Sequence, residues 1–116
     1  MIDLKNIPFT RKKALIRESC LMYKLIKNRI NQIEAVAESN DIVMKPIHIK
    51  VALQEHKRAS TFEMLFGLLE KEEQTLISND FLLVSDYDWW RKTYSKSTYY
   101  KLKHQAIDKF VGLLYS

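Results

Sequence analysis

The sequence predicts an all-α protein of about five helices, and three observations support this fold class. Apolar residues recur every three or four positions over long stretches, which is the period of one face of a helix. The 116 residues include only two glycines and two prolines, so the backbone conformations of tight hairpins are scarce. Hydrophobic residues make up 47% and charged residues 28%, as in a folded globular chain. At this length we expect residues 1–116 to form a single domain.

The first expected helix is the longest and runs from Arg11 to about Glu38, after Thr10. Its apolar stripe is Leu15, Ser19, Met22, Ile26, Ile30, Ile33 and Ala37. At 1.5 Å per residue this helix is about 40 Å long, which exceeds what the core of a domain of this size requires. We therefore expect part of it to pack against another chain, with a homodimer as one form.

A second helix is expected from about Ile47 to Leu69, because Pro46 is acceptable near a helix start. Its stripe is Ala52, Ala59, Phe62, Phe66 and Leu69. Residues 10–69 thus form a long helical hairpin. The acidic run Glu70, Glu72 and Glu73 then begins a short third helix, where carboxylates favour the positive end of the helix dipole, and this helix ends near Asn79.

Residues 70–116 are expected to form a helix-turn-helix-like unit of three helices. The run Ser85-Asp86-Tyr87-Asp88 has the pattern of an N-cap and predicts a short fourth helix over residues 86–92. Ser95 or Ser97 caps a fifth helix, whose apolar stripe is Tyr99, Leu102, Ala106, Phe110 and Leu113. Two short helices followed by a brief turn and a longer helix give the outline of a helix-turn-helix.

The outer side of the fifth expected helix collects cations and hydroxyls. These candidate nucleic-acid-binding residues are Lys96, Ser97, Tyr100, Lys101 and His104, preceded by Arg91 and Lys92 as phosphate anchors. Such groups bind phosphate oxygens, and Lys or Ser also reaches base edges in the major groove. Duplex DNA is therefore the expected partner, and RNA binding through the same surface stays open.

The distribution of charge along the chain also suits a nucleic-acid partner. The net charge is +5, and residues 1–40 carry eight Lys or Arg against four Asp or Glu. Residues 41–80 carry five against seven, and residues 81–116 carry six against three. Positive charge at both ends suits a polyanionic partner, although it is also typical of ordinary solvated helices.

The stretch SKSTYYKLKHQAIDKFVGLL resembles the recognition-helix end of the ArpU-type phage transcriptional regulators, a group similar to region four of bacterial sigma factors. LLEKEEQTLISNDFL is similar to the acidic first helix of that unit. The chain departs from the pattern at Thr93, where a glycine is usual, and at Trp89, where a small residue is usual. The whole chain also resembles a small family of mollicute proteins through WW and YSKSTYYKLK, which implies no function.

Several classes of function are not expected. The sequence has no P-loop, no G-x-S-x-G elbow and no H-E-x-x-H motif, so we predict no enzyme activity and no cofactor. The three histidines and Cys20 lack metal-ligand spacing, so no metal site is expected. One unpaired cysteine fits a reduced, cytoplasmic location. The stretch MIDLKNIPFTRKK has no apolar h-region, and no later apolar run is near the roughly 20 residues that cross a bilayer, so we expect a chain that is neither exported nor inserted in a membrane.

Two hypotheses of function follow. The first is a DNA-binding, transcription-associated protein that uses a C-terminal helix-turn-helix. The second is a helical protein–protein interaction module that binds a second copy of itself or RNA polymerase and binds no nucleic acid. The excess length of the first helix and the bulky ring of Trp89 favour the second hypothesis.

Overall fold

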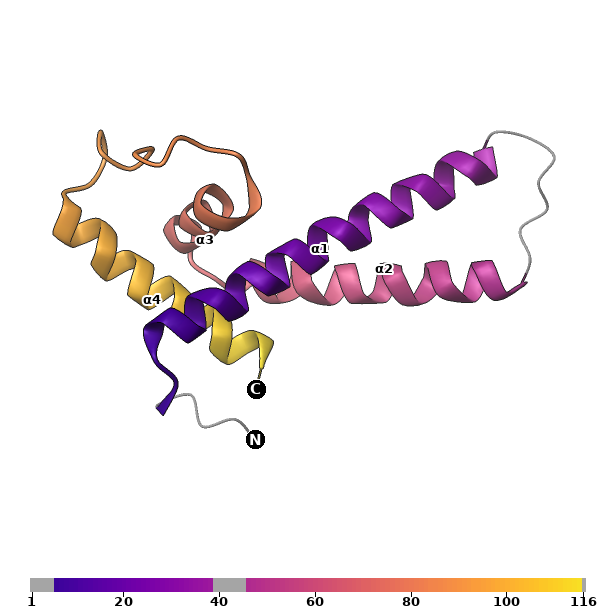
Figure 1. Ribbon diagram of the computed structural model, residues 1–116, viewed down its shortest axis with the longest axis horizontal. Coiled ribbons are helices and arrows are strands. Elements are labelled where there is room, and N and C mark those ends of the chain that lie inside the picture. The colour runs from indigo at the N-terminus through magenta and orange to yellow at the C-terminus, as the bar shows by residue number, and fades with distance from the viewer. Residues whose placement is uncertain (1–5, 39–45, 116) are drawn as a thin grey trace.

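A computed structural model describes residues 6–38 and 46–115, and these residues form four α-helices and no strand. The helices are α1 (Phe9–Glu38), α2 (Pro46–Gly67), α3 (Lys71–Ile77) and α4 (Lys96–Leu114), and a π-helical segment, η2 (Ser78–Leu82), continues α3. The all-α class and the long first helix are therefore confirmed. The molecule measures 56 × 37 × 21 Å along its principal axes, and its longest direction follows the α1–α2 hairpin (Figure 1).

The hairpin projects as an arm away from α3 and α4 (Figure 1). Inside it, Ile26 and Ile30 of α1 pack with Ala59 of α2 in a small buried cluster of their own. Nearer the body of the molecule the ring of Tyr23 stacks on that of Phe62, with their centroids 4.3 Å apart. The antiparallel pairing of the two helices thus buries one stripe of each, as the spacing of apolar residues requires.

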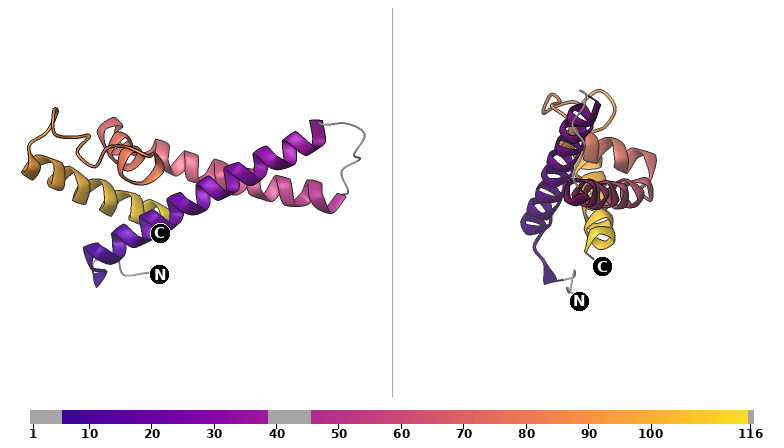
Figure 2. Two further views of the ribbon diagram at one scale, coloured as in Figure 1. Left: turned by 45° about the horizontal axis from the view of Figure 1, so that its top comes forward. Right: turned by 90° about the vertical axis from the view of Figure 1, so that its right-hand side faces the viewer.

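The main core lies where all four helices meet. It contains residues from the start of α1, the end of α2 and the residues after it, the last turn of α3 and the length of α4: Ile16, Cys20, Phe62, Leu69, Leu76, Ile77, Tyr99, Ala106, Ile107, Phe110 and Val111. Figures 1 and 2 both show the start of α1 crossing the C-terminal half of α4. The hairpin and the C-terminal helices therefore share one hydrophobic core.

The buried stripe of α1 differs from the expected one in its first half. Ile16 and Cys20 are fully buried, whereas Leu15 and Ser19 are half-buried and Met22 is 40% exposed. Both sets of residues satisfy the three-to-four spacing of a helix face. The choice between them depends on α4, which packs against the start of α1 from a direction that local spacing does not reveal.

The expected short helix over residues 86–92 is wrong, because this segment is a series of turns. Its backbone bonds span three residues, from the amide of Trp89 to the carbonyl of Asp86 and from the amide of Arg91 to that of Asp88. The hydroxyl of Ser85 donates to Asn79 Oδ1 at 2.8 Å, so this side chain does not serve as an N-cap. Isolated helices this short are marginal, and the two tryptophans gain more by packing inward.

The connection before α4 is consequently longer than the brief turn that was expected. Residues 83–95 lie between η2 and α4 as bends and turns, so α3 and α4 are not joined as in a simple helix-turn-helix. Among the helices of the described ranges, none is at once long enough and apolar enough to cross a bilayer.

Candidate nucleic-acid interface

Helix α4 begins at a cap made by Ser95. The Ser95 hydroxyl accepts a hydrogen bond from the backbone amide of Thr98 at 3.3 Å and donates to Thr98 Oγ1 at 2.9 Å. An N-cap oxygen of this kind satisfies one of the four amides that the first turn of a helix leaves unpaired. All residues of α4 are described, and its first turn carries no acid. The positive end of this helix is therefore not neutralised by its own side chains.

Four of the predicted residues lie together on the first two turns of α4. Lys96, Ser97, Tyr100 and Lys101 are all exposed. Neither of these two lysines forms an ion pair with any described residue. On this half of the helix the predicted outer side is free, while Tyr99 faces the core with 4% of its surface exposed.

The fifth predicted residue of α4, His104, lies where α1 crosses. Its ring is exposed at one side but stacks on Phe9, with the ring centroids 3.6 Å apart and the planes inclined by 15°. One turn further on, Lys12 Nζ of α1 contacts Asp108 Oδ1 of α4 at 2.8 Å. The helix α1 therefore approaches the outer side of α4 from His104 onward and leaves the first two turns open.

The two predicted phosphate anchors lie on the turns before α4. Arg91 is exposed, and its guanidinium carbon lies 5.8 Å from the ring centroids of both Tyr87 and Trp90. Lys92 is exposed and forms no ion pair with any residue in the described part of the chain. The structure thus brings the predicted cations of residues 91–101 to one end of the molecule, although they do not lie on successive helices.

A mostly buried carboxylate, Asp80, whose side chain is 11% exposed, holds these turns against α4. Its Oδ1 accepts a hydrogen bond from the indole of Trp89 at 2.8 Å, and its Oδ2 accepts one from the Tyr99 hydroxyl at 2.6 Å. Lys103 Nζ lies 3.3 Å from the same Oδ2. Burial, and then the bond to Asp80, raises the pKa of Tyr99 above its usual range. Trp90 completes the cluster by stacking on Tyr99 at 4.4 Å.

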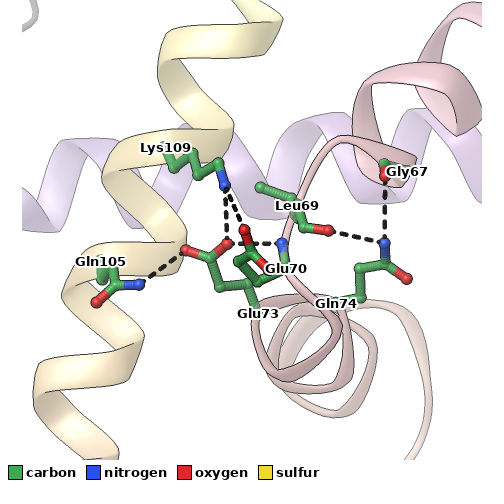
Figure 3. Close-up of polar contacts among 7 residues, drawn as sticks. All are labelled: Gly67, Leu69, Glu70, Glu73, Gln74, Gln105 and Lys109. Carbon is green, nitrogen blue, oxygen red and sulfur yellow. Dashed lines mark hydrogen bonds and ion pairs between the residues drawn. The ribbon is translucent and has the colours of Figure 1, made fainter.

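A second buried carboxylate, Glu73, fixes α4 to α3 (Figure 3). Its Oε1 accepts from the backbone amide of Glu70 at 2.8 Å and from Lys109 Nζ at 3.2 Å, and its Oε2 accepts from Gln105 Nε2 at 3.3 Å. Burial raises the pKa of Glu73, but these hydrogen bonds outweigh burial and leave the pKa below its usual value. The acidic run therefore does more than complement the helix dipole.

Two basic residues have roles that the sequence alone did not reveal. Lys103 is turned inward to Asp80, with 18% of its side chain exposed, so it adds little to the outer positive charge. Arg17 of α1 is exposed and lies 5.9 Å from the ring centroid of Phe81, on the same side of the molecule as the start of α4. No local pattern indicates this position of Arg17, because it comes near the turns before α4 only through the crossing of α1 and α4.

Comparisons with protein-family models, with curated proteins and with solved structures found no match for this chain. The geometry of the described residues is therefore the basis for the function proposed below.

A second surface with a distinct character lies along the arm. An open groove of about 720 Å³ runs between α1 and α2 and reaches the end of α4, and most of its lining is apolar, including Leu15, Met22, Ile26 and Leu65. Its edges carry Glu18 on α1 and the cations Lys57 and Arg58 on α2. Further large apolar side chains are exposed on the same two helices, namely Leu21, Leu25, Leu53 and Met64.

Proposed function

We propose that this chain binds duplex DNA through the start of α4 and the turns that precede it. One observation carries the proposal: the outward cations Lys92, Lys96 and Lys101 have no counter-ion among the described residues. Lys103 and Lys109 are instead paired with Asp80, whose side chain is 11% exposed, and with Glu73, whose side chain is 1% exposed. Exposed, unpaired cations beside a helix N-terminus supply the field that attracts a polyanion.

The contacts divide into two kinds. Lys92 and Lys96 bind phosphate oxygens, which positions the protein without reading sequence. Ser97, Tyr100 and Lys101 project from the first two turns of α4, so these side chains are the ones that reach base edges when that end of the helix enters the major groove. A transcription-associated role, and RNA polymerase as a protein partner, remain predictions that rest on the sequence resemblance.

The test is a titration of labelled duplex DNA at several salt concentrations. Each phosphate contact contributes a slope of about 0.9 in a plot of log affinity against log salt. The double variant Lys92→Ala, Lys96→Ala should lower the slope by about 1.8 while its circular dichroism spectrum stays that of the native protein. The matched control is Lys24→Ala, Lys50→Ala, which removes the same charge from exposed positions on the arm. An equal effect in both variants would reject the assignment.

The groove along the arm favours a second function, self-association through α1 and α2. Its apolar lining and the opposite charges at its edges suit a second copy of the same surface. Light scattering at increasing concentration should then show a dimer, and Met22→Glu, which places a charge in the groove, should return it to a monomer. Leu53→Glu is the control, because Leu53 is 65% exposed and does not line the groove. A monomer at every concentration would exclude this function.

A further inference from the structure

A cavity of about 580 Å³ opens on the flank of α4, between that helix, the turns before it and the start of α1. Sites for small molecules usually measure about 300–1,000 Å³, so this one has the size for a compact ligand. It lies beside the proposed DNA-binding face and shares Lys96 and Tyr100 with it, whereas Lys101 is not part of its lining.

The cavity carries an excess of positive charge. Arg17, Arg91 and Lys96 line it and form no ion pair with any described residue. The acids in its lining are Asp80 and Asp86, and Asp80 is already occupied by the three contacts described above. An open cavity with this balance concentrates positive potential and attracts an anion.

Aromatic rings stand beside these cations. Tyr87 is 83% exposed and Tyr100 is 46% exposed, and both line the cavity. The Arg91 guanidinium lies 5.8 Å from the ring centroid of Tyr87, which places a charge and a free ring side by side. A flat, π-rich group that also bears a negative charge satisfies both features, and a base with its phosphate is such a group.

We infer that this cavity binds an unpaired nucleotide. Arg17, Arg91 and Lys96 hold the phosphate, and the base stacks on Tyr100 or Tyr87. A base inside a duplex is paired and stacked, so only a free nucleotide or an unpaired nucleotide of a strand enters. Stacking on aromatic side chains is tolerant of sequence, since every base has a π-face.

The inference deepens the proposed function, because it adds a preference for unpaired nucleotides to the same end of the molecule. Substitutions at two residues distinguish the cavity from the duplex-binding face. Arg17, on α1, lines only the cavity, whereas Lys101, on α4, lies outside it. Four probes distinguish the ligand sources: a paired duplex, a single strand of the same sequence, adenosine monophosphate and inorganic phosphate. Binding is measured by quenching of tryptophan fluorescence, since Trp90 lines the cavity.

We expect the single strand to bind at least about fivefold more tightly than the duplex, because one stacked base is worth at least about that factor. Arg17→Gln should reduce the salt slope for the single strand by about 0.7 and leave duplex binding unchanged. Tyr87→Ala, an exposed position, should weaken binding of the single strand and of adenosine monophosphate. Lys101→Ala, outside the cavity, should weaken duplex binding and leave the binding of adenosine monophosphate unchanged.

Each alternative outcome is decisive. Equal affinity for the single strand and the duplex, with no effect of Arg17→Gln, would overturn nucleotide binding in the cavity. It would leave the proposed binding of duplex DNA intact. Binding of adenosine monophosphate and the single strand without any duplex binding would uphold the cavity and reject the duplex proposal. Inorganic phosphate competing as well as adenosine monophosphate would show that the base is not bound and would overturn the inference.

Discussion

Replacing Glu73 with Gln tests whether this buried carboxylate anchors α4. The side chain is 1% exposed, and the substitution keeps its size while removing its charge. Hydrogen bonds to charged groups contribute about 1.5–3 kcal/mol and those to neutral groups about 0.5–1.5. The bond from the Glu70 amide therefore weakens by about 1 kcal/mol, and the bond to Gln105, whose amide must turn over to accept from the new NH2 group, weakens by about the same. The contact with Lys109, which is 39% exposed, adds little because solvent screens it.

The expected loss in the free energy of unfolding is therefore about 2 kcal/mol, or about 8 °C in Tm for a chain of this length. Thermal unfolding followed by circular dichroism at pH 7 measures it. The matched control is Glu72→Gln, which removes an exposed acid from the same first turn. Both variants lose a similar interaction with the helix dipole, about 0.3–1 kcal/mol, so only Glu73→Gln should exceed that value. Equal losses in the two variants would refute the reasoning.

The dependence on pH follows from the lowered pKa of Glu73 in the folded state. A carboxyl whose pKa is lower when folded binds fewer protons in the folded state, so its stabilisation is present above the unfolded pKa and disappears as pH falls through the folded pKa. The ordinary value is 4.5, so the difference between the wild type and Glu73→Gln should be constant near neutrality and shrink below about pH 4.5. A difference that grows in acid would contradict this sign.

Three further predictions concern single residues. Asp80→Asn should reduce the free energy of unfolding by about 2–3 kcal/mol, because the charge of Lys103, which is 18% exposed, then has no counter-charge. It should also change the near-ultraviolet circular dichroism of the tryptophans. Cys20 is 0% exposed and burial raises its pKa to about 12, so a maleimide should label it at pH 8 only as fast as the protein unfolds, and rapid labelling of the native protein would disprove its burial. His104→Ala should weaken duplex binding less than Lys101→Ala does, because its ring already stacks on Phe9, and a larger effect at His104 in the same titration would reverse this order.

The helical period predicted most of the packing of α2 and α4. Ala59 and Phe62 of α2, Leu69 just after it, and Tyr99, Ala106 and Phe110 of α4 are buried as the spacing indicated, whereas Phe66 and Leu102 are half-buried. Each of these helices has one dominant apolar stripe, so one pattern decides which side faces the core. α1 has two acceptable stripes in its first half, and only its contact with α4 selects Ile16 and Cys20.

The segment before α4 shows where local patterns fail. Ser85 and the acids after it have the composition of a helix cap, a local preference of about 1 kcal/mol. In the structure, the indole of Trp89 reaches Asp80 and the ring of Trp90 stacks on Tyr99, which lies nine positions further along the chain. Burying aromatic rings contributes more than one cap, so these longer-range contacts decide the backbone conformation.

The candidate site could be predicted only in part for the same reason. The outward direction of Ser97 and Lys101 follows from the period of α4, since the apolar stripe occupies another side. Lys96 lies one turn before Tyr99 on the same side, and it is exposed because no residue of α4 before Tyr99 is buried. The inward turn of Lys103 does not follow, because its partner Asp80 comes from η2. Residues brought together by a crossing of helices leave no trace in local spacing.

Two carboxylates from one short stretch of chain set the orientation of α4 about its own axis. Glu73 of α3 contacts Gln105 and Lys109, and Asp80 of η2 contacts Tyr99 and Lys103, so α4 is held both near its start and at its middle. Rotation of α4 by one residue, about 100°, would break both sets of contacts and leave the charges of Glu73 and Asp80 without partners on α4. The contacts that pair Lys103 and Lys109 therefore also fix the direction of Ser97 and Lys101. The unpaired positive charge at the start of α4 is a consequence of how this helix is held against α3 and η2.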